Sequence, residues 1–215
     1  MTFLVVLIGW VFSLCLHEFS HAAVAYAGGD TTVREKGYLT FNPLKYTHPV
    51  YSIVVPLIFL ALGGIGLPGG AVYIETWRLR SRWWKSAVSL AGPMSNLVLA
   101  IVLGVILAAS PVSREGLWPG LAFLAFLQVS ALVLNLIPLP PFDGFGVLQP
   151  FLPERIQTAV AQVSGLIPWA VFFLLWYVPE VYNTFWTAVV GLTHMLNVPL
   201  DLVQLGLRDF RFWYR

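Results

Sequence analysis

Long apolar stretches alternate with short polar segments along most of the chain. A helix that crosses a bilayer needs roughly 20 apolar residues, and three stretches come close to this length: residues 2–27, 87–109 and 121–137. Two shorter stretches are further candidates for spans: about residues 164–178 and about residues 185–198. The pattern therefore predicts a helical protein that passes through a membrane several times.

A sixth apolar stretch, residues 50–66, is short and contains Pro56 and the pair Gly63–Gly64. The polar segments 30–48 and 75–85 on either side of it both carry more Lys and Arg than acid, which is typical of cytoplasmic loops. If both face the cytoplasm, residues 50–66 must enter and leave the membrane by one face. We therefore expect a re-entrant segment there, with a full span as the alternative.

The remaining polar segments complete the predicted topology. Residues 110–120 are nearly uncharged and are expected to face outward, whereas the basic tail from Arg208 to Arg215 is expected to return to the cytoplasmic side. The β-forming residues around 38–41 and 71–74 predict short strands or a hairpin.

Composition agrees with this picture and excludes one class of partner. The chain has 58% hydrophobic and only 10% charged residues, and its mean hydropathy is +0.79. The net charge of +2 is too small, without a basic tract, to indicate nucleic-acid binding. We expect an all-α polytopic membrane protein of about five to six transmembrane helices, with a first helix that is retained rather than cleaved as a signal peptide.

The first apolar stretch contains the motif HEFSH, which places ionisable groups where they are costly. His17 and His21 are four residues apart and share a helix face, and Glu18 lies beside them. The spacing H-E-x-x-H is typical of zinc proteases, in which two imidazoles bind the metal and the glutamate handles a proton. Hydrogen bonds between neutral histidines and a neighbouring helix are the structural alternative, but they leave the carboxylate without a partner.

A catalytic zinc ion usually has a third protein ligand. His48 and His194 are lone histidines, which more often pack or face solvent. Asp143 differs, because it follows an apolar stretch directly in NLIPLPPFDG, where prolines end the helix and Gly144 permits a tight turn. A turn capped by the aspartate is the structural alternative, but with HEFSH in the same chain we favour Asp143 as the ligand.

Together, HEFSH and NLIPLPPFDG resemble the motifs of the site-2 protease family, the zinc intramembrane metalloproteases of peptidase family M50. The family pattern N-x-x-P-x-P-x-x-D-G falls on residues 135–144, with Phe142 where leucine is usual. AGPMSN, at residues 91–96, resembles the motif of the intervening core helix, and GYLTFNPLKYTHP resembles a segment that follows the first motif in compact members. The resemblance covers roughly residues 10–150, and we expect a compact form without PDZ or CBS domains.

The resemblance implies one Zn²⁺ per chain, held by His17, His21 and Asp143, with Glu18 as the catalytic acid–base. It makes Asn135 plausible as a substrate-binding or oxyanion group; Asn96 is a second candidate, with a helix–helix hydrogen bond as its alternative. It also implies a single membrane domain, with a catalytic core in residues 1–150 and C-terminal transmembrane helices in residues 151–215.

The expected function is hydrolysis of peptide bonds in or near transmembrane segments of other proteins, as in regulated intramembrane proteolysis. Transmembrane protein substrates and the lipid bilayer are the implied partners, and the oligomeric state stays open. The implied location is a prokaryotic cell membrane, with the active site toward the cytoplasm. A membrane metal transporter or sensor and an inactive, protease-like binding protein are the alternatives.

Overall fold

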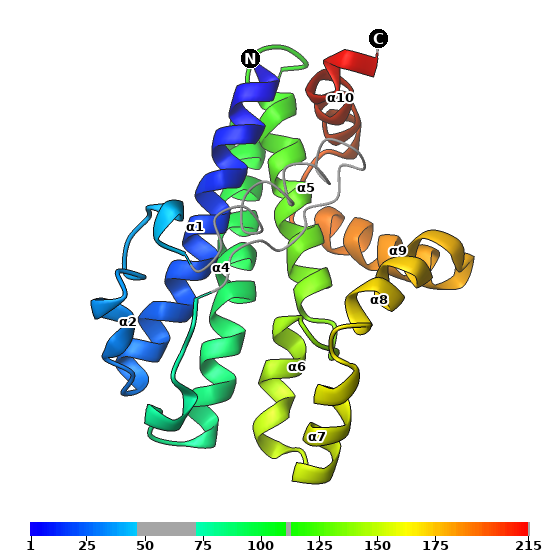
Figure 1. Cartoon of the computed structure of the whole chain (residues 1–215). Helices are drawn as coiled ribbons and strands as arrows, with labels where there is room; N and C mark the ends of the chain where they lie inside the picture. Colours follow the sequence, from blue (N-terminus) through cyan, green and yellow to red (C-terminus); the bar gives the residue numbers. More distant parts are fainter. Residues whose placement is uncertain (47–71, 111–112, 215) are drawn as a thin grey trace.

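The computed structural model describes residues 1–46, 72–110 and 113–214 (Figure 1). Within these ranges every regular element is a helix. The predicted strands are not confirmed, since neither residues 38–41 nor residues 72–74 are assigned to one. The predicted re-entrant segment, residues 50–66, lies outside the described residues.

Three long helices form the body of the molecule: α1 (Thr2–Gly28), α4 (Arg82–Ala109) and α5 (Trp118–Asn135). Each is long and apolar enough to cross a membrane, so the three longest predicted spans are helices and candidate spans in the structure. In α1, Leu4, Ile8 and Phe12 repeat every four residues and are largely exposed. An exposed apolar stripe of this kind suits contact with lipid, and the chain is an integral membrane protein.

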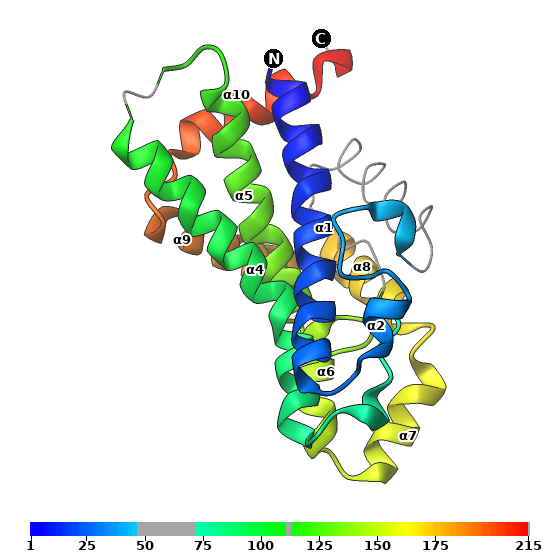
Figure 2. The same cartoon turned by 90° about the vertical axis from the view of Figure 1, so that its left-hand side faces the viewer.

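Helix α5 lies in the middle of the bundle and packs against α1, α4 and the C-terminal helix α10 (Leu200–Phe210). Its side chains form the main apolar core together with those of α1, where Trp10, Phe123 and Leu127 are almost completely buried. Figure 2 shows α4 crossing α1 at an angle, so the two helices are close only along part of their length. This region of close approach contains the candidate site.

The C-terminal third differs from the two simple spans predicted at residues 164–178 and 185–198. The pairs α7 (Glu154–Val163) with α8 (Ile167–Tyr177), and α9 (Pro179–Met195) with α10, are bent by 70° and 116° at short breaks. Helix α8 has 11 residues and is about 16 Å long, too short to cross a bilayer alone. The described residues therefore provide three spans, or up to five if each bent pair counts as one.

The C-terminal tail lies at the opposite end of the bundle from the one predicted. Phe210 stacks on Phe3, with ring centroids 5.3 Å apart, and Asp201 forms a 2.9 Å ion pair with Arg114. The tail is therefore beside the N-terminus and the 113–117 loop, and away from the basic segment 75–85 (Figure 1). Ring packing and an ion pair hold it there, which the count of arginines in the tail did not reveal.

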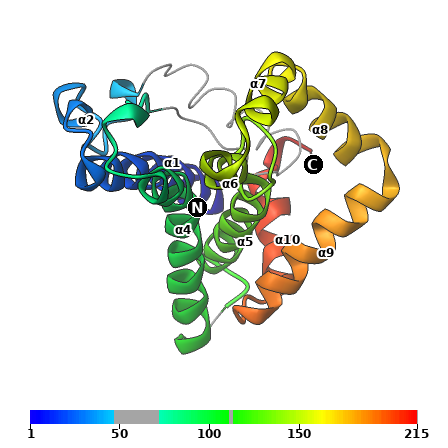
Figure 3. The same ribbon diagram turned by 90° about the horizontal axis from the view of Figure 1, so that it is seen from below.

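Shorter elements surround the lower end of the three long helices as drawn in Figure 1. They are α2 (Thr32–Glu35), η1 (Pro43–Lys45), η3 (Thr76–Arg78), α6 (Asp143–Leu148) and η4 (Gln149–Phe151). A last short turn, η5 (Phe212–Tyr214), ends the described chain. Figure 3 shows α7, α8 and α9 forming an arc on the side of the bundle away from α2. The site residues predicted from the sequence belong to α1, α4, α5 and α6, and none belongs to this arc.

Candidate metal centre

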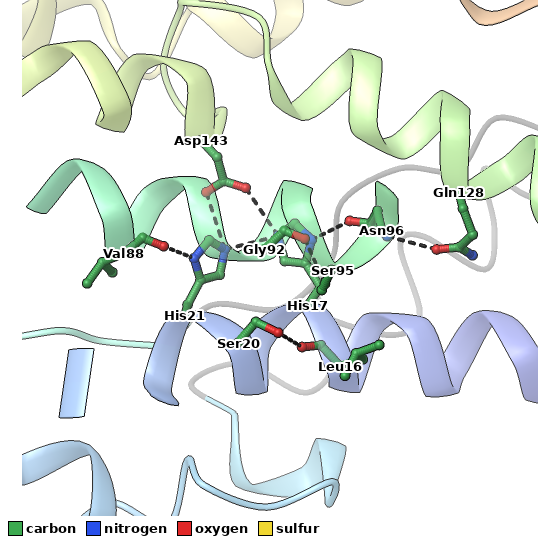
Figure 4. A network of polar contacts seen from close by, with 10 residues as sticks. All are labelled: Leu16, His17, Ser20, His21, Val88, Gly92, Ser95, Asn96, Gln128 and Asp143. Atoms are coloured by element: carbon green, nitrogen blue, oxygen red, sulfur yellow. Dashed lines mark hydrogen bonds and ion pairs between the residues drawn. The ribbon is translucent and has the colours of Figure 1, made fainter. Parts of the chain in front are cut away.

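The two histidines of HEFSH point from α1 toward α4 (Figure 4). The four-residue spacing places both imidazoles on one face of the helix, and both side chains are buried together with Glu18. His17 and His21 lie 11 and 7 residues before the end of α1 at Gly28, or about 17 and 11 Å from it at the rise of an α-helix. The site therefore lies within the helix bundle, at some depth from the end at which α1 stops.

Asp143 reaches the histidines because the chain folds back after α5. The helix ends at Asn135, the proline-containing turn follows, and Asp143 is the first residue of α6. Gly144 makes the fold-back possible, since a Cβ atom at this position would collide with the carbonyl groups of Leu136 and Ile137. The carboxylate of Asp143 faces the two imidazoles.

Three potential ligand atoms converge at this point. Nε2 of His17 lies 3.0 Å from Nε2 of His21 and 3.1 Å from Oδ2 of Asp143, and Nε2 of His21 lies 3.4 Å from Oδ1 of Asp143. Atoms placed about 2.0–2.1 Å from a tetrahedral zinc ion are roughly 3.3 Å apart. The three side chains are therefore spaced as the protein ligands of one such ion would be.

The other ring nitrogens are fixed by acceptors on α4. Nδ1 of His21 donates to the backbone carbonyl of Val88 over 2.6 Å, and Nδ1 of His17 donates to Oδ1 of Asn96 over 2.6 Å (Figure 4). Since each Nδ1 carries the proton, each neutral ring presents a bare lone pair at Nε2. Two lone pairs and a carboxylate then face one another without a donor among them, an arrangement that a cation would stabilise.

Space for the two rings comes from a glycine in α4. A Cβ atom built on Gly92 would overlap ring atoms of both His17 and His21. Gly92 lies four residues from Val88 and four from Asn96, so all three are on one face of α4. This face provides the carbonyl that binds His21, the space for the two rings at Gly92, and the amide that binds His17. The two helices can approach closely only because this position has no side chain.

A cavity of about 360 Å³ opens on the cluster. Glu18, Asn135, Asp143 and both histidines line it, together with Val72 and Ile74 from the segment before η3. Glu18 thus faces the same space as the candidate ligands without belonging to their set, as a proton-transferring group must.

The segment that carries Val72 and Ile74 is held in place by Asp30. This carboxylate is fully buried; it accepts from the backbone N–H of Glu75 over 2.8 Å and from the hydroxyl and N–H of Thr32 over 2.6 and 3.1 Å. The backbone N–H of Arg80 also donates to the carbonyl of Gly28 over 3.0 Å. One wall of the cavity is thereby fixed to the end of α1.

Ion pairs reinforce the same wall. Glu75 pairs with Lys36 over 2.9 Å and with Arg78 over 2.6 Å. The hydrogen bond from the Lys36 ammonium, and then that from the Arg78 guanidinium, lower the pKa of Glu75 below its usual value. Glu75 therefore stays ionised to lower pH than a free glutamate, and the two contacts persist with it.

A comparison with known protein families shows to which family the chain belongs. The family model described as peptidase family M50 matches residues 3–113, which include HEFSH, Gly92 and Asn96. The chain belongs to peptidase family M50. This confirms the family resemblance drawn from the two motifs.

Curated relatives of this M50 chain agree. A protein of Mycolicibacterium smegmatis named "Putative zinc metalloprotease Rip2" is 46% identical over 214 residues, which are 98% of this chain and 81% of the relative. YwhC of Bacillus subtilis, named in the same way, is 30% identical over 174 residues, covering 76% of this chain and 77% of the relative. These names support the predicted zinc cofactor. No solved structure matches the chain with significance.

In this M50 chain the predicted ligands are brought together, whereas the two predicted amides are in different places. Asn135 is buried at the end of α5 and lines the cavity, and its side chain has no hydrogen-bond partner within the described residues. Asn96 does not line the cavity; it accepts from His17 and donates to Oε1 of Gln128 over 2.8 Å. Its amide therefore joins α1, α4 and α5, the helix–helix role considered as its alternative.

The other histidines do not join the cluster in the described part of the chain. His194 is exposed on α9, and among residues 1–46, 72–110 and 113–214 the one group of three side chains able to hold a metal ion is His17, His21 and Asp143. His48 lies outside the described residues.

Sequence reasoning missed three residues that build this M50 site, namely Val88 with its carbonyl, Gln128 and Asp30, and it singled out Gly92 only through the family resemblance. A backbone carbonyl has no sequence signal, and Gln128 is one polar residue in an apolar helix whose partner cannot be guessed. Gly92 and Asn96 share a face at a spacing of four residues, which could have indicated a helix packed closely against polar side chains. Asp30 follows directly on the glycine pair that ends α1, and its burial depends on residues 45 positions away.

Proposed function

We propose that this protein is a zinc-dependent intramembrane endopeptidase that cleaves other membrane proteins in or near their transmembrane segments. The observation that carries the proposal is the convergence of two Nε2 lone pairs and one carboxylate, 3.0–3.4 Å apart, beside a buried glutamate. Three protein ligands leave a fourth position open, as catalytic zinc sites do and structural ones do not. Family membership and the names of the relatives support the same reading.

Each side chain has a defined part in this reaction. His17, His21 and Asp143 would hold the ion, which would supply Lewis-acid activation of a water molecule and of the scissile carbonyl. Glu18 accepts the proton that the attacking water loses and delivers it to the nitrogen of the leaving amine. The amide of Asn135 faces the same cavity and donates to the substrate backbone or to the oxygen on which charge develops.

The surroundings suit a membrane substrate. The cavity lies between helices that are long and apolar enough to span a bilayer, and Val72 and Ile74 form one wall of it. The cavity lies toward the end of the bundle that carries the basic segment 75–85, since Val72 and Ile74 lead directly into this segment and Arg80 bonds to Gly28 at the end of α1. We place this end in the cytoplasm of a prokaryotic cell, because Lys and Arg accumulate on that side of a membrane.

Within this proposal, residues 1–150 are the catalytic core, because all ligands, Glu18 and both amides belong to them. Residues 151–215 add the helices that pack on α5 from the other side. A metal transporter would call for further ligands along a pathway, and the described residues contain one cluster only. Glu18 lines the cavity beside that cluster without being one of its ligands. Hydrolysis gives this carboxylate a role in proton transfer, whereas metal transport or simple binding gives it none.

The test compares the native protein with Glu18→Gln in liposomes that contain a tagged single-span substrate. Glutamine is nearly isosteric, so zinc content should stay at one ion per chain while cleavage falls by about 10²–10⁴-fold. His21→Ala should lose both zinc and cleavage. Equal cleavage by native and Glu18→Gln protein would contradict the proposal, as would a native protein that holds zinc and cleaves no membrane substrate.

A further inference from the structure

A second cavity, of about 330 Å³, lies beside the first. It is enclosed by the first turns of α4, by α6 and η4, by Gln157 of α7 and by the segment around η3. Most of its lining is polar: Thr76, Arg82, Lys85, Ser89, Gln149 and Gln157. Nothing in the proposed reaction uses this space.

The two cavities are neighbours. Ile74, Val88 and Ser89 line both of them. Val88 is also the residue whose carbonyl fixes His21, so the second cavity begins next to the metal centre. A peptide in extended conformation advances about 3.3 Å per residue, and one bound at the catalytic cavity would reach the second within a few residues.

The second cavity is positively charged. Arg82 and Lys85 are three residues apart on α4 and line it, and no acidic side chain does so. Neither forms an ion pair within the described part of the chain. Arg82 lies over the ring of Phe151, 5.2 Å from its centroid, which holds the guanidinium beside the opening. The cavity thus offers two cations without a protein counter-charge.

The backbone at the start of α4 adds to the positive charge of the two side chains. Arg82 begins α4, a helix of 28 residues, and the preceding Ser81 makes no side-chain capping bond. The first N–H groups of a helix lack intrahelical acceptors and carry the positive end of its dipole. With the two side chains, they favour an anion at this position.

We propose that this second cavity is a substrate subsite that binds an acidic side chain, Asp or Glu, located a few residues from the scissile bond. The inference rests on the proposed protease function and adds a specificity to it. The position of this cavity next to the catalytic one, with three lining residues in common, favours the substrate itself as the source of the anion. An anionic lipid headgroup is the other source of such charge, and the experiment below distinguishes the two.

The experiment uses full-length protein in liposomes of zwitterionic phosphatidylcholine. A single-span substrate is prepared with Gln at each of four positions on either side of the cleaved bond, and each is compared with its Glu counterpart. At one position Glu should raise kcat/KM roughly 10- to 100-fold over Gln, as expected for a hydrogen bond to a charged group. The ratio of the two rates is the readout, so small changes in enzyme quality cancel.

Enzyme variants then assign the effect to the cavity. Lys85→Gln should remove the difference between the Glu and Gln substrates, and Lys85→Glu should invert it, so that a Lys substrate is preferred. Arg155→Gln is the matched control, because Arg155 is a nearby exposed cation of α7 that does not line the cavity. It should retain the native preference for Glu.

The outcomes separate this inference from the proposed function. If native protein cleaves all substrates at equal rates, or if Arg155→Gln abolishes the preference as Lys85→Gln does, the subsite is refuted while the protease function stands. If Lys85 matters only when anionic phospholipid is added, whatever the substrate charge, a lipid headgroup is the ligand and the subsite is again refuted. Cleavage that is absent, or equal in Glu18→Gln, refutes the proposed function itself.

Discussion

Replacing Gly92 by alanine adds one methyl group at the most restrictive point of the metal centre. The new Cβ atom would lie 2.6 Å from Cε1 of His17 and closer still to Nε2 of both histidines, whereas ordinary contacts begin at 3.4 Å. The rings must therefore retreat by about 0.8 Å or more. Metal–ligand distances tolerate roughly ±0.2 Å, so we expect Gly92→Ala to lose its zinc.

The matched control is Gly191→Ala, also in the interior of a helix, where a Cβ atom meets nothing within 4 Å. Helix propensity alone favours alanine over glycine by about 0.5–1 kcal/mol, so this variant should be slightly stabilised and retain its zinc. Zinc per chain is measured by mass spectrometry of the purified proteins, and affinity by competition with a chelator. Stoichiometric zinc of native affinity in Gly92→Ala would refute the assignment of the centre to these two rings.

Three further predictions follow from the contacts around the site. Asn96→Leu should weaken zinc binding about 10- to 100-fold, because His17 loses its orienting acceptor, whereas Gln128→Met should leave zinc affinity within a few-fold of native; equal losses would assign Asn96 a packing role only. Asp30→Ala should leave the N–H of Glu75 without its acceptor, at a cost of about 1–3 kcal/mol, and unchanged hydrogen exchange of residues 72–80 would contradict this. The pKa of Glu75 in the folded protein is lowered from 4.5, so its ion pairs stabilise the segment above that pH and are lost as the pH falls further. Hydrogen exchange of residues 72–80, corrected for its intrinsic pH dependence, should therefore rise below about pH 4.5 in native protein. In Glu75→Gln it should stay independent of pH.

The residues that carry chemistry were the easiest to predict from sequence. A pair of histidines four residues apart in an apolar helix has few structural explanations, and a proline-rich turn before Asp143 predicts a fold-back. The supporting contacts were harder, because they depend on which helix faces which. Asn96 illustrates this: its residue type allowed either substrate binding or a helix contact, and only the position of His17 and Gln128 shows that its amide is already used.

The C-terminal third was predicted less well for a different reason. Hydropathy detects apolar length but not a break, and the bends fall at residues 164–166 and 196–199, where Gly165 and Asn197 interrupt the helices. Asn197 adopts a φ of 56°, which helices do not allow. The side of the membrane on which the tail lies was predicted wrongly, because the prediction relied on the three arginines of the tail. Sequence alone does not show that Phe210 packs on Phe3 or that Asp201 pairs with Arg114.

The candidate metal ligands come from positions up to 126 residues apart, His17 in the first helix and Asp143 after the third long one. During synthesis, the histidines leave the ribosome and enter the bilayer long before the aspartate exists. If the proposed function holds, a nascent chain can neither retain the ion nor cleave its neighbours until its third long helix has been inserted and has turned back. Distance along the polypeptide would then delay proteolytic activity until assembly of the core is complete.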